Sequence, residues 1–165
     1  IRVLTVIDEV TRECLALEVD SSITGRKVAA VLNRIAIFRG MPQEILTDNG
    51  SEFSNPNALE LTSKGTRRTR IYYCDPGAAY QKPNVELNHE FIRKILPKGR
   101  SFDAFNQDDI NLMMSHINSY SREKLQDKSP IDVFEFLYGS NVLSKLGIYK
   151  IPANEIILKP SLLKK

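Results

Sequence analysis

The order of its predicted elements makes this chain a mixed α/β protein. Two strand-like segments open the sequence, a helical segment and two short strands follow, and helical patterns fill the rest. Of the 165 residues, 42% are apolar and 26% charged, so one core can be buried but a second full domain does not fit. We expect a core over residues 1–122 and a helical extension over 123–165.

The opening segments predict a β-hairpin followed by a helix. Residues 1–8 are rich in β-branched side chains, and residues 14–20 alternate apolar with polar side chains. Ser22 or Thr24 can cap the helix, because apolar residues then recur at i, i+3, i+4 and i+7. Gly40 lies just past the last of these residues and should end the helix.

Two short strands are predicted in the middle of the chain. Residues 44–47 form the first, which ends at Asp48, and residues 70–74 form the second, which an Asp-Pro-Gly turn stops. The polar stretch 50–70 between them should be irregular, with one helical turn near 58–61.

Three helices are predicted after the last strand. Residues 84–96 form the first. Its apolar stripe is expected to consist of Leu87, Phe91, Ile92, Ile95 and Leu96. Asn106, followed three residues later by an Asp, is typical of the capped start of the second helix. Ser129 before Pro130 opens the third helix, which should end at Gly139.

Two acidic residues are candidates for chemistry. Asp48 follows a strand directly, and Glu86 lies on the polar face of a helix. Carboxylates held in this way can bind Mg²⁺ or Mn²⁺, and two such ions can activate the attacking oxygen and neutralise the leaving oxygen of a phosphodiester. Asp-Asn-Gly is also an ordinary turn, and a Glu on a polar helix face is usually only solvated, so neither motif alone indicates catalysis.

Basic residues collect in the same part of the chain as these acids. Residues 60–100 contain nine Lys and Arg against four Asp and Glu, whereas the whole chain has a net charge of +3. A solvated basic surface would explain this excess, but the excess also lies where a bound polyanion would need it.

Several motifs resemble those of DDE transposases and retroviral-type integrases. The run Leu46–Phe53, with its Thr-Asp-Asn-Gly centre, resembles the second-acid motif of bacterial insertion-sequence transposases and retroviral integrases. Tyr73–Pro76, Gln81–Lys82, Glu86, Asn88–Arg93 and Leu96–Gly99 resemble the third-acid region of one transposase branch. Val3–Cys14 is similar to the second-strand turn of the same superfamily, and the whole resemblance covers residues 2–138.

The resemblance implies a ribonuclease H-like mixed sheet with flanking helices, in which this chain lacks the family's first strand. It implies that Asp48 and Glu86 are ligands of a two-metal site for Mg²⁺ or Mn²⁺. The first acidic ligand of the family would then be Asp8, which also ends a strand, or a residue upstream of this chain. The residues around Asp8 match the family's hairpin turn instead. Glu90, one turn beyond Glu86, is the rival for the third acid.

The implied function is that of a bacterial transposase or integrase core that performs metal-dependent DNA strand cleavage and strand transfer. Lys82, Arg93 and Lys94 are the expected phosphate contacts, which would position DNA without reading its sequence. Weaker candidates are Gln81, Asn88 and His89. The expected partners are DNA, as element ends and target, and further copies of the chain. The alternatives are another ribonuclease H-like nuclease, or a catalytically incomplete DNA-binding or assembly remnant of a mobile element.

Two further expectations concern activity and location. Two carboxylates hold a pair of divalent ions less well than three, so the chain as given should cleave and join DNA poorly. The sequence has no apolar run of about 18 residues and no signal-peptide pattern, so we expect a protein of the bacterial cytoplasm with no membrane partner.

Overall fold

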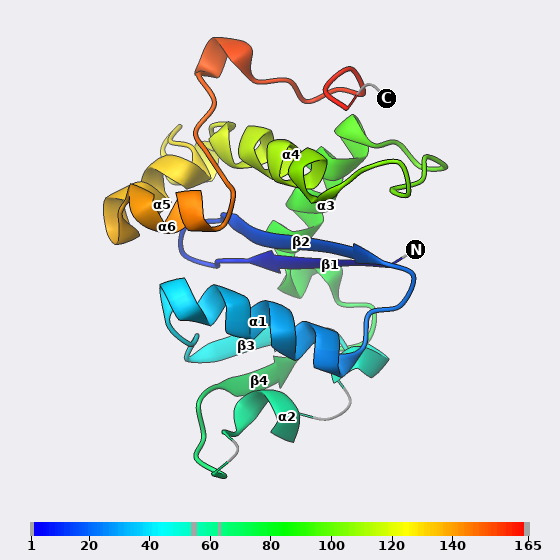
Figure 1. Ribbon diagram of the computed structural model, residues 1–165, viewed down its shortest axis with the longest axis vertical. Coiled ribbons are helices and arrows are strands. Elements are labelled where there is room, and N and C mark those ends of the chain that lie inside the picture. Colours follow the sequence, from blue (N-terminus) through cyan, green and yellow to red (C-terminus); the bar gives the residue numbers. More distant parts are fainter. Residues whose placement is uncertain (1, 54–55, 63, 164–165) are drawn as a thin grey trace. The chain divides into compact units, whose positions relative to one another are not determined.

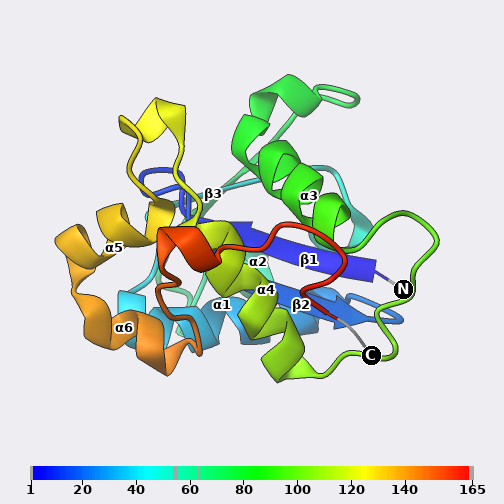
Figure 2. The same cartoon turned by 90° about the horizontal axis from the view of Figure 1, so that it is seen from above.

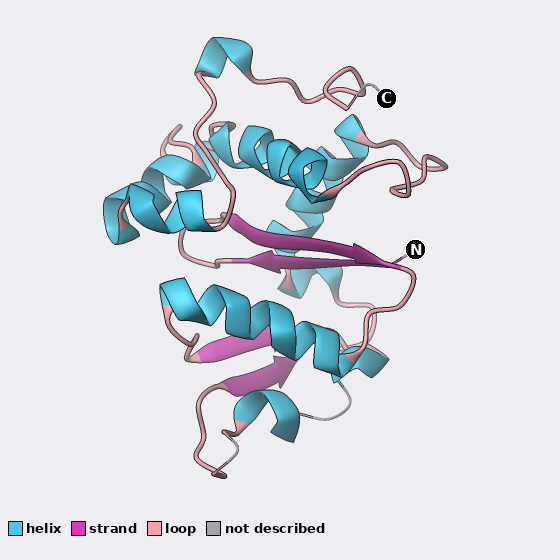
Figure 3. Cartoon of the chain, in the orientation of Figure 1, coloured by secondary structure: helices cyan, strands magenta, loops and turns pink. Residues whose placement is uncertain are grey.

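The structure, a computed structural model, divides into two compact units. Its described residues are 2–53, 56–62 and 64–163. Unit 1 comprises Thr5–Leu17 and the chain from Asn84 onward, and unit 2 comprises Arg2–Leu4 and Glu18–Pro83. Helices and strands are mixed in the first half and helices follow to the end, which confirms the predicted α/β class (Figure 3). None of the helices in these residues has the length and apolar character needed to cross a membrane.

The predicted hairpin is formed by β1 (Arg2–Ile7) and β2 (Cys14–Asp20), which run in opposite directions (Figure 1). Asp8 holds the turn between them. Its Oδ1 accepts hydrogen bonds from the backbone N–H groups of Val10 (2.9 Å) and Thr11 (2.8 Å). Asp8 therefore has a structural role in the turn, in agreement with the hairpin-turn motif that it matches.

In unit 2, α1 (Gly25–Arg39) forms where the sequence predicts it. The Thr24 hydroxyl caps the helix by accepting a hydrogen bond from the Lys27 N–H (3.3 Å). Gly40 ends it with a φ of 79°, a left-handed value that glycine adopts without strain. The buried residues of the helix are Val28, Val31, Leu32 and Ile35.

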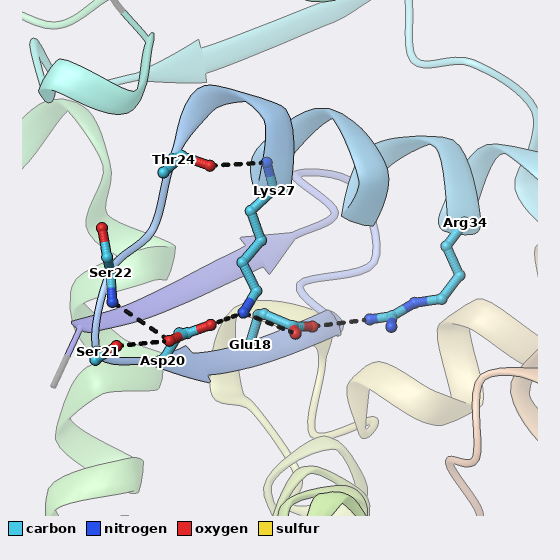
Figure 4. A network of polar contacts seen from close by, with 7 residues as sticks. All are labelled: Glu18, Asp20, Ser21, Ser22, Thr24, Lys27 and Arg34. Carbon is cyan, nitrogen blue, oxygen red and sulfur yellow. Dashed lines mark hydrogen bonds and ion pairs between the residues drawn. The ribbon is translucent and has the colours of Figure 1, made fainter.

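A polar network connects α1 to the end of β2 (Figure 4). Lys27 pairs with Asp20 and with Glu18, and Arg34 Nη2 lies 3.2 Å from Glu18 Oε2. Asp20 also accepts a hydrogen bond from the Ser21 hydroxyl (3.0 Å). Because these side chains are partly exposed, each ion pair stabilises the unit by less than about 1 kcal/mol. The buried apolar face of α1 therefore supplies most of its attachment.

β3 (Glu44–Thr47) and β4 (Arg70–Tyr73) form a parallel pair in unit 2, with their last residues opposite each other. Among the described residues this pair and the hairpin are separate two-stranded sheets. The stretch between β3 and β4 contains η1 (Ser51–Phe53) and α2 (Asn57–Glu60), close to the predicted helical turn. Because the strands are parallel, both carboxyl ends lie at one edge of the pair.

α3 (Pro83–Ile95) carries Glu86, and its buried residues are Asn84, Asn88, Phe91, Ile92 and Ile95. The predicted apolar stripe is wrong at Leu87, which is 37% exposed. The reason lies in what the first turns of the helix meet. Asn84 Nδ2 donates a hydrogen bond to Glu9 Oε2 (2.6 Å), so this end of the helix contacts the polar hairpin turn. At that polar surface a buried amide can form hydrogen bonds, whereas a leucine side chain cannot.

The remaining helices of unit 1 are α4 (Gln107–Ser119), α5 (Pro130–Tyr138) and α6 (Ser140–Lys145). Capping boxes on Asn106 and Ser129 start α4 and α5, as predicted, whereas the sequence did not predict α6. Short 3₁₀ turns are η2 (Ala79–Gln81), η3 (Glu123–Leu125) and η4 (Ala153–Glu155). The boundary at residue 122 between a core and an extension stays a prediction.

α4 binds the carboxyl-terminal segment, which passes over it (Figure 2). Three backbone N–H groups of that segment donate to side chains of α4: Tyr149 to Ser115 Oγ (3.2 Å), Ile151 to Ser119 Oγ (2.9 Å) and Ile157 to His116 Nδ1 (3.1 Å). These polar side chains are buried, so the backbone of the segment provides the hydrogen-bond partners that they need. The same bonds hold the segment against α4.

Candidate active site

Asp48 directly follows β3, as predicted, at the edge where the two parallel strands end. The Cys74 N–H donates to the Thr47 carbonyl (2.8 Å), and Asn49 Nδ2 donates to the Cys74 carbonyl (3.2 Å). These bonds tie the ends of β3 and β4 together on both sides of Asp48. Its side chain is 64% exposed, so a rigid backbone presents the carboxylate to solvent.

Both carboxylate oxygens of Asp48 have partners within unit 2. Oδ1 accepts a hydrogen bond from the Gly50 N–H (3.3 Å). Oδ2 accepts one from Lys82 Nζ (3.1 Å), and the Lys82 side chain is only 15% exposed. The lysine predicted to contact phosphate thus pairs with the predicted metal ligand.

The loop that carries Lys82 is closed by Gln81. Gln81 Oε1 accepts from the Asp75 N–H (2.8 Å), and Gln81 Nε2 donates to Asp75 Oδ2 (2.9 Å). Gln81, a weaker candidate for phosphate contact, therefore orders the loop between β4 and α3. Sequence reasoning missed this role, because the Asp-Pro-Gly motif indicates a turn but not which side chain closes the loop.

Glu86 lies in the first turn of α3, and its side chain is half-buried, whereas Glu90 one turn later is exposed. His89 Nε2 is 3.3 Å from Thr5 Oγ1 of β1, so this histidine contacts the hairpin. Asn88, another weaker candidate, is 2% exposed and is not placed to meet DNA. The helix thus directs Glu86 and Glu90 away from its buried face.

Arg93 and Lys94 are exposed in the last turn of α3, as a phosphate contact requires. Lys94 Nζ lies 4.8 Å from the centroid of the Phe91 ring. Arg122, which sequence reasoning missed, stacks on the same ring with Cζ at 4.0 Å from the centroid. Burial lowers the pKa of Arg122 to about 10, and its Nη2 donates to the Ile117 carbonyl (3.2 Å). This buried guanidinium connects α3 to α4, and no local pattern could have revealed it.

Asp48 belongs to unit 2 and Glu86 to unit 1, so their meeting at one metal ion stays a prediction. Within the described part of the chain, His, Cys, Asp and Glu side chains form no group of three or more that could hold a metal.

Comparison with known proteins shows similarity to integrases and transposases. Residues 1–79 match the family described as the integrase core domain. The 39.2 kDa protein of insertion element IS476 from Xanthomonas euvesicatoria is 38% identical over 87 residues, which cover 52% of this chain and 24% of that protein. The transposase of insertion sequence element IS1086 from Cupriavidus metallidurans is 21% identical over 128 residues, 77% of this chain and 37% of that protein.

A third relative is the transposase InsI of insertion sequence element IS30A from Escherichia coli, 30% identical over 103 residues, 59% of this chain and 26% of that protein. The chain thus spans between 24% and 37% of the length of these three relatives. Together the comparisons confirm the predicted resemblance to the catalytic cores of DDE transposases and integrases. The integrase core domain also confirms the ribonuclease H-like fold class.

Proposed function

We propose that the chain is the core of a DNA transposase or integrase that cleaves and joins DNA strands with the help of divalent metal ions. One observation carries the proposal: Asp48 stands, in its Thr-Asp-Asn-Gly motif, at the tied ends of a parallel strand pair, in a segment that matches the integrase core domain. DNA, as element ends and target, and further copies of the chain are the proposed partners.

The donors fit the proposed metal in kind. Mg²⁺ and Mn²⁺ prefer oxygen ligands, and Asp48 and Glu86 offer carboxylates. These two residues would hold the metal, which when bound activates the attacking oxygen and neutralises the leaving oxygen of the phosphodiester. The tied strand end fixes the backbone of Asp48, and the buried face of α3 fixes the direction of Glu86.

The basic residues support DNA as the substrate. Arg93 and Lys94 end α3, the helix that carries Glu86, and Lys82 lies beside Asp48. Phosphate contacts of this kind position a duplex without reading its sequence. The charge excess over residues 60–100 would then bring the polyanion to the proposed metal ligands.

Strand transfer of a pre-cut DNA end in Mn²⁺ tests the proposal. The assay should use both this chain and a version that carries whatever its gene encodes before Ile1. Asp48→Asn and Glu86→Gln should reduce transfer to background with unchanged thermal unfolding, and Glu90→Gln is the matched control that should retain it. If Glu90→Gln abolishes transfer while Glu86→Gln is active, the third acid lies one turn further along the helix.

Asp8→Asn separates the two assignments of the first acid. The Asn Oδ1 can still accept both turn hydrogen bonds, so the turn should survive and transfer should persist. Loss of transfer with intact folding would make Asp8 the first acid. Cleavage without joining would indicate a nuclease, and DNA binding without either reaction would indicate a non-catalytic remnant.

A further inference from the structure

Lys82 differs from an ordinary surface lysine. Its side chain is 15% exposed, against 64% for the side chain of Asp48, with which it pairs. Its backbone N–H donates to the Ala79 carbonyl (3.0 Å), and the preceding Gln81 closes the loop onto Asp75. An ordered loop therefore delivers the ammonium group to one carboxylate oxygen.

That oxygen is the one a metal ion would need. Oδ1 of Asp48 is turned toward the Gly50 N–H (3.3 Å), and Oδ2 accepts from Lys82 Nζ (3.1 Å). An ammonium group and a divalent cation repel each other at such distances and compete for the same lone pairs.

We propose that Lys82 is a resident counter-ion of Asp48, which occupies the carboxylate in the metal-free chain and is displaced when the divalent cation binds. The inference rests on the proposed role of Asp48 as a metal ligand. Displacement moves the ammonium group away from Oδ2 and leaves it beside the metal, free to contact a DNA phosphate. Lys82 thus acts as a positioning residue before the metal binds and as a phosphate contact afterwards.

The ion pair between Lys82 and Asp48 is weak enough for a metal ion to replace Lys82. An ion pair with an exposed partner shifts an equilibrium by no more than about fivefold, so the metal can displace Lys82 without a large loss of affinity. Metal and DNA binding should also be coupled through this one side chain. If the metal frees Lys82 for phosphate, DNA must by reciprocity strengthen metal binding through the same residue.

Titration of the full chain with Mn²⁺, followed by the electron paramagnetic resonance signal of the free ion, tests the inference. Lys82→Gln should tighten Mn²⁺ binding about two- to fivefold, because the competing charge is gone. Lys82→Arg, which keeps the charge, should leave the affinity close to that of the parent chain. Lys64→Gln removes the same charge from an exposed lysine of unit 2 and should change it much less. Asp48→Asn should weaken binding strongly.

The outcomes separate the inference from the function on which it rests. If Asp48→Asn leaves Mn²⁺ binding unchanged, the proposed metal role of Asp48 is wrong and the inference fails with it. If Asp48→Asn weakens binding but Lys82→Gln weakens it too or changes nothing, Asp48 remains a ligand and only the counter-ion role is overturned.

A second measurement follows Lys82 on the DNA side. Binding of a DNA duplex should lose more affinity through Lys82→Gln in Mn²⁺ than in EDTA, since only the metal-bound chain has a free Lys82. An equal loss in the two conditions would refute the displacement.

Discussion

Asn118 should be among the polar side chains that contribute most to the folding stability of unit 1. Its side chain is fully buried and faces the backbone of β2. Oδ1 accepts from the Cys14 N–H (2.9 Å), and Nδ2 donates to the Cys14 carbonyl (3.0 Å) and lies 3.5 Å from Glu13 Oε1. The amide thus pairs with both backbone groups of one residue, as a neighbouring strand would.

The cost of Asn118→Ala follows from these two bonds. Cys14 is 2% exposed, so water cannot replace the lost partner of its N–H or of its carbonyl. Each buried backbone group left without a partner costs roughly 1–3 kcal/mol, which gives about 4 kcal/mol for the pair. A domain of this size is stable by about 5–15 kcal/mol, so the variant should lose between roughly a quarter and four-fifths of its stability.

Urea unfolding followed by circular dichroism measures this loss. Asn33→Ala is the matched control, because the Asn33 Oδ1 accepts an exposed hydrogen bond from Arg68 Nη1 (2.9 Å) that water can replace. We expect the control to lose less than about 1 kcal/mol. If the losses in the free energy of unfolding of the two variants differ by less than about 1 kcal/mol, the hydrogen bonds of the Asn118 amide to the Cys14 backbone do not have the expected effect on stability.

Three further outcomes follow from the structure. Burial lowers the pKa of His116 from its ordinary value of 6.5, so the folded chain binds fewer protons than the unfolded one. The contribution of His116 to stability should therefore be constant above about pH 6.5 and fall as the pH drops below it. His116→Gln, which keeps an acceptor for the Ile157 N–H, should flatten that fall when the free energy of unfolding is measured against pH. Burial, and to a lesser degree the neighbouring Glu13, raises the pKa of Cys14 to about 12, so iodoacetamide should modify this thiol only after denaturant is added; rapid modification of the native chain would contradict the packing. DNA affinity should fall steeply with salt. Replacing Lys82 together with Arg93 by Ala should reduce the slope of log K against log salt by about 1 to 2. An unchanged slope would mean that neither side chain contacts the phosphate backbone of the DNA.

Features set by neighbours in the sequence could be predicted. Thr24, Asn106 and Ser129 cap the helices that follow them, and Gly40 ends a helix, because each acts on backbone groups within one turn. Asp48 at a strand end follows from the same local reasoning, since a short β-branched run must stop at an Asn-Gly turn.

Features set by distant residues could not be predicted. The pairing of Lys82 with Asp48 joins positions 34 apart, and that of Asn118 with Cys14 joins positions 104 apart. Periodicity placed Leu87 in the buried stripe of α3 because it registers hydrophobicity alone. It cannot register that the surface opposite the first turns of the helix is polar.

In the proposed function, Asp48 and Glu86 hold the same metal centre. Crystals of the chain with a pre-cut DNA end, grown in Mn²⁺ and measured for anomalous scattering, test it most directly. We expect a Mn²⁺ peak within about 2–2.5 Å of a carboxylate oxygen of each residue, with Lys82 moved from Asp48 to a phosphate. A Mn²⁺ ion bound by Asp48 and Glu90 with Glu86 in solvent, or no Mn²⁺ at Asp48, would contradict a metal centre shared by Asp48 and Glu86.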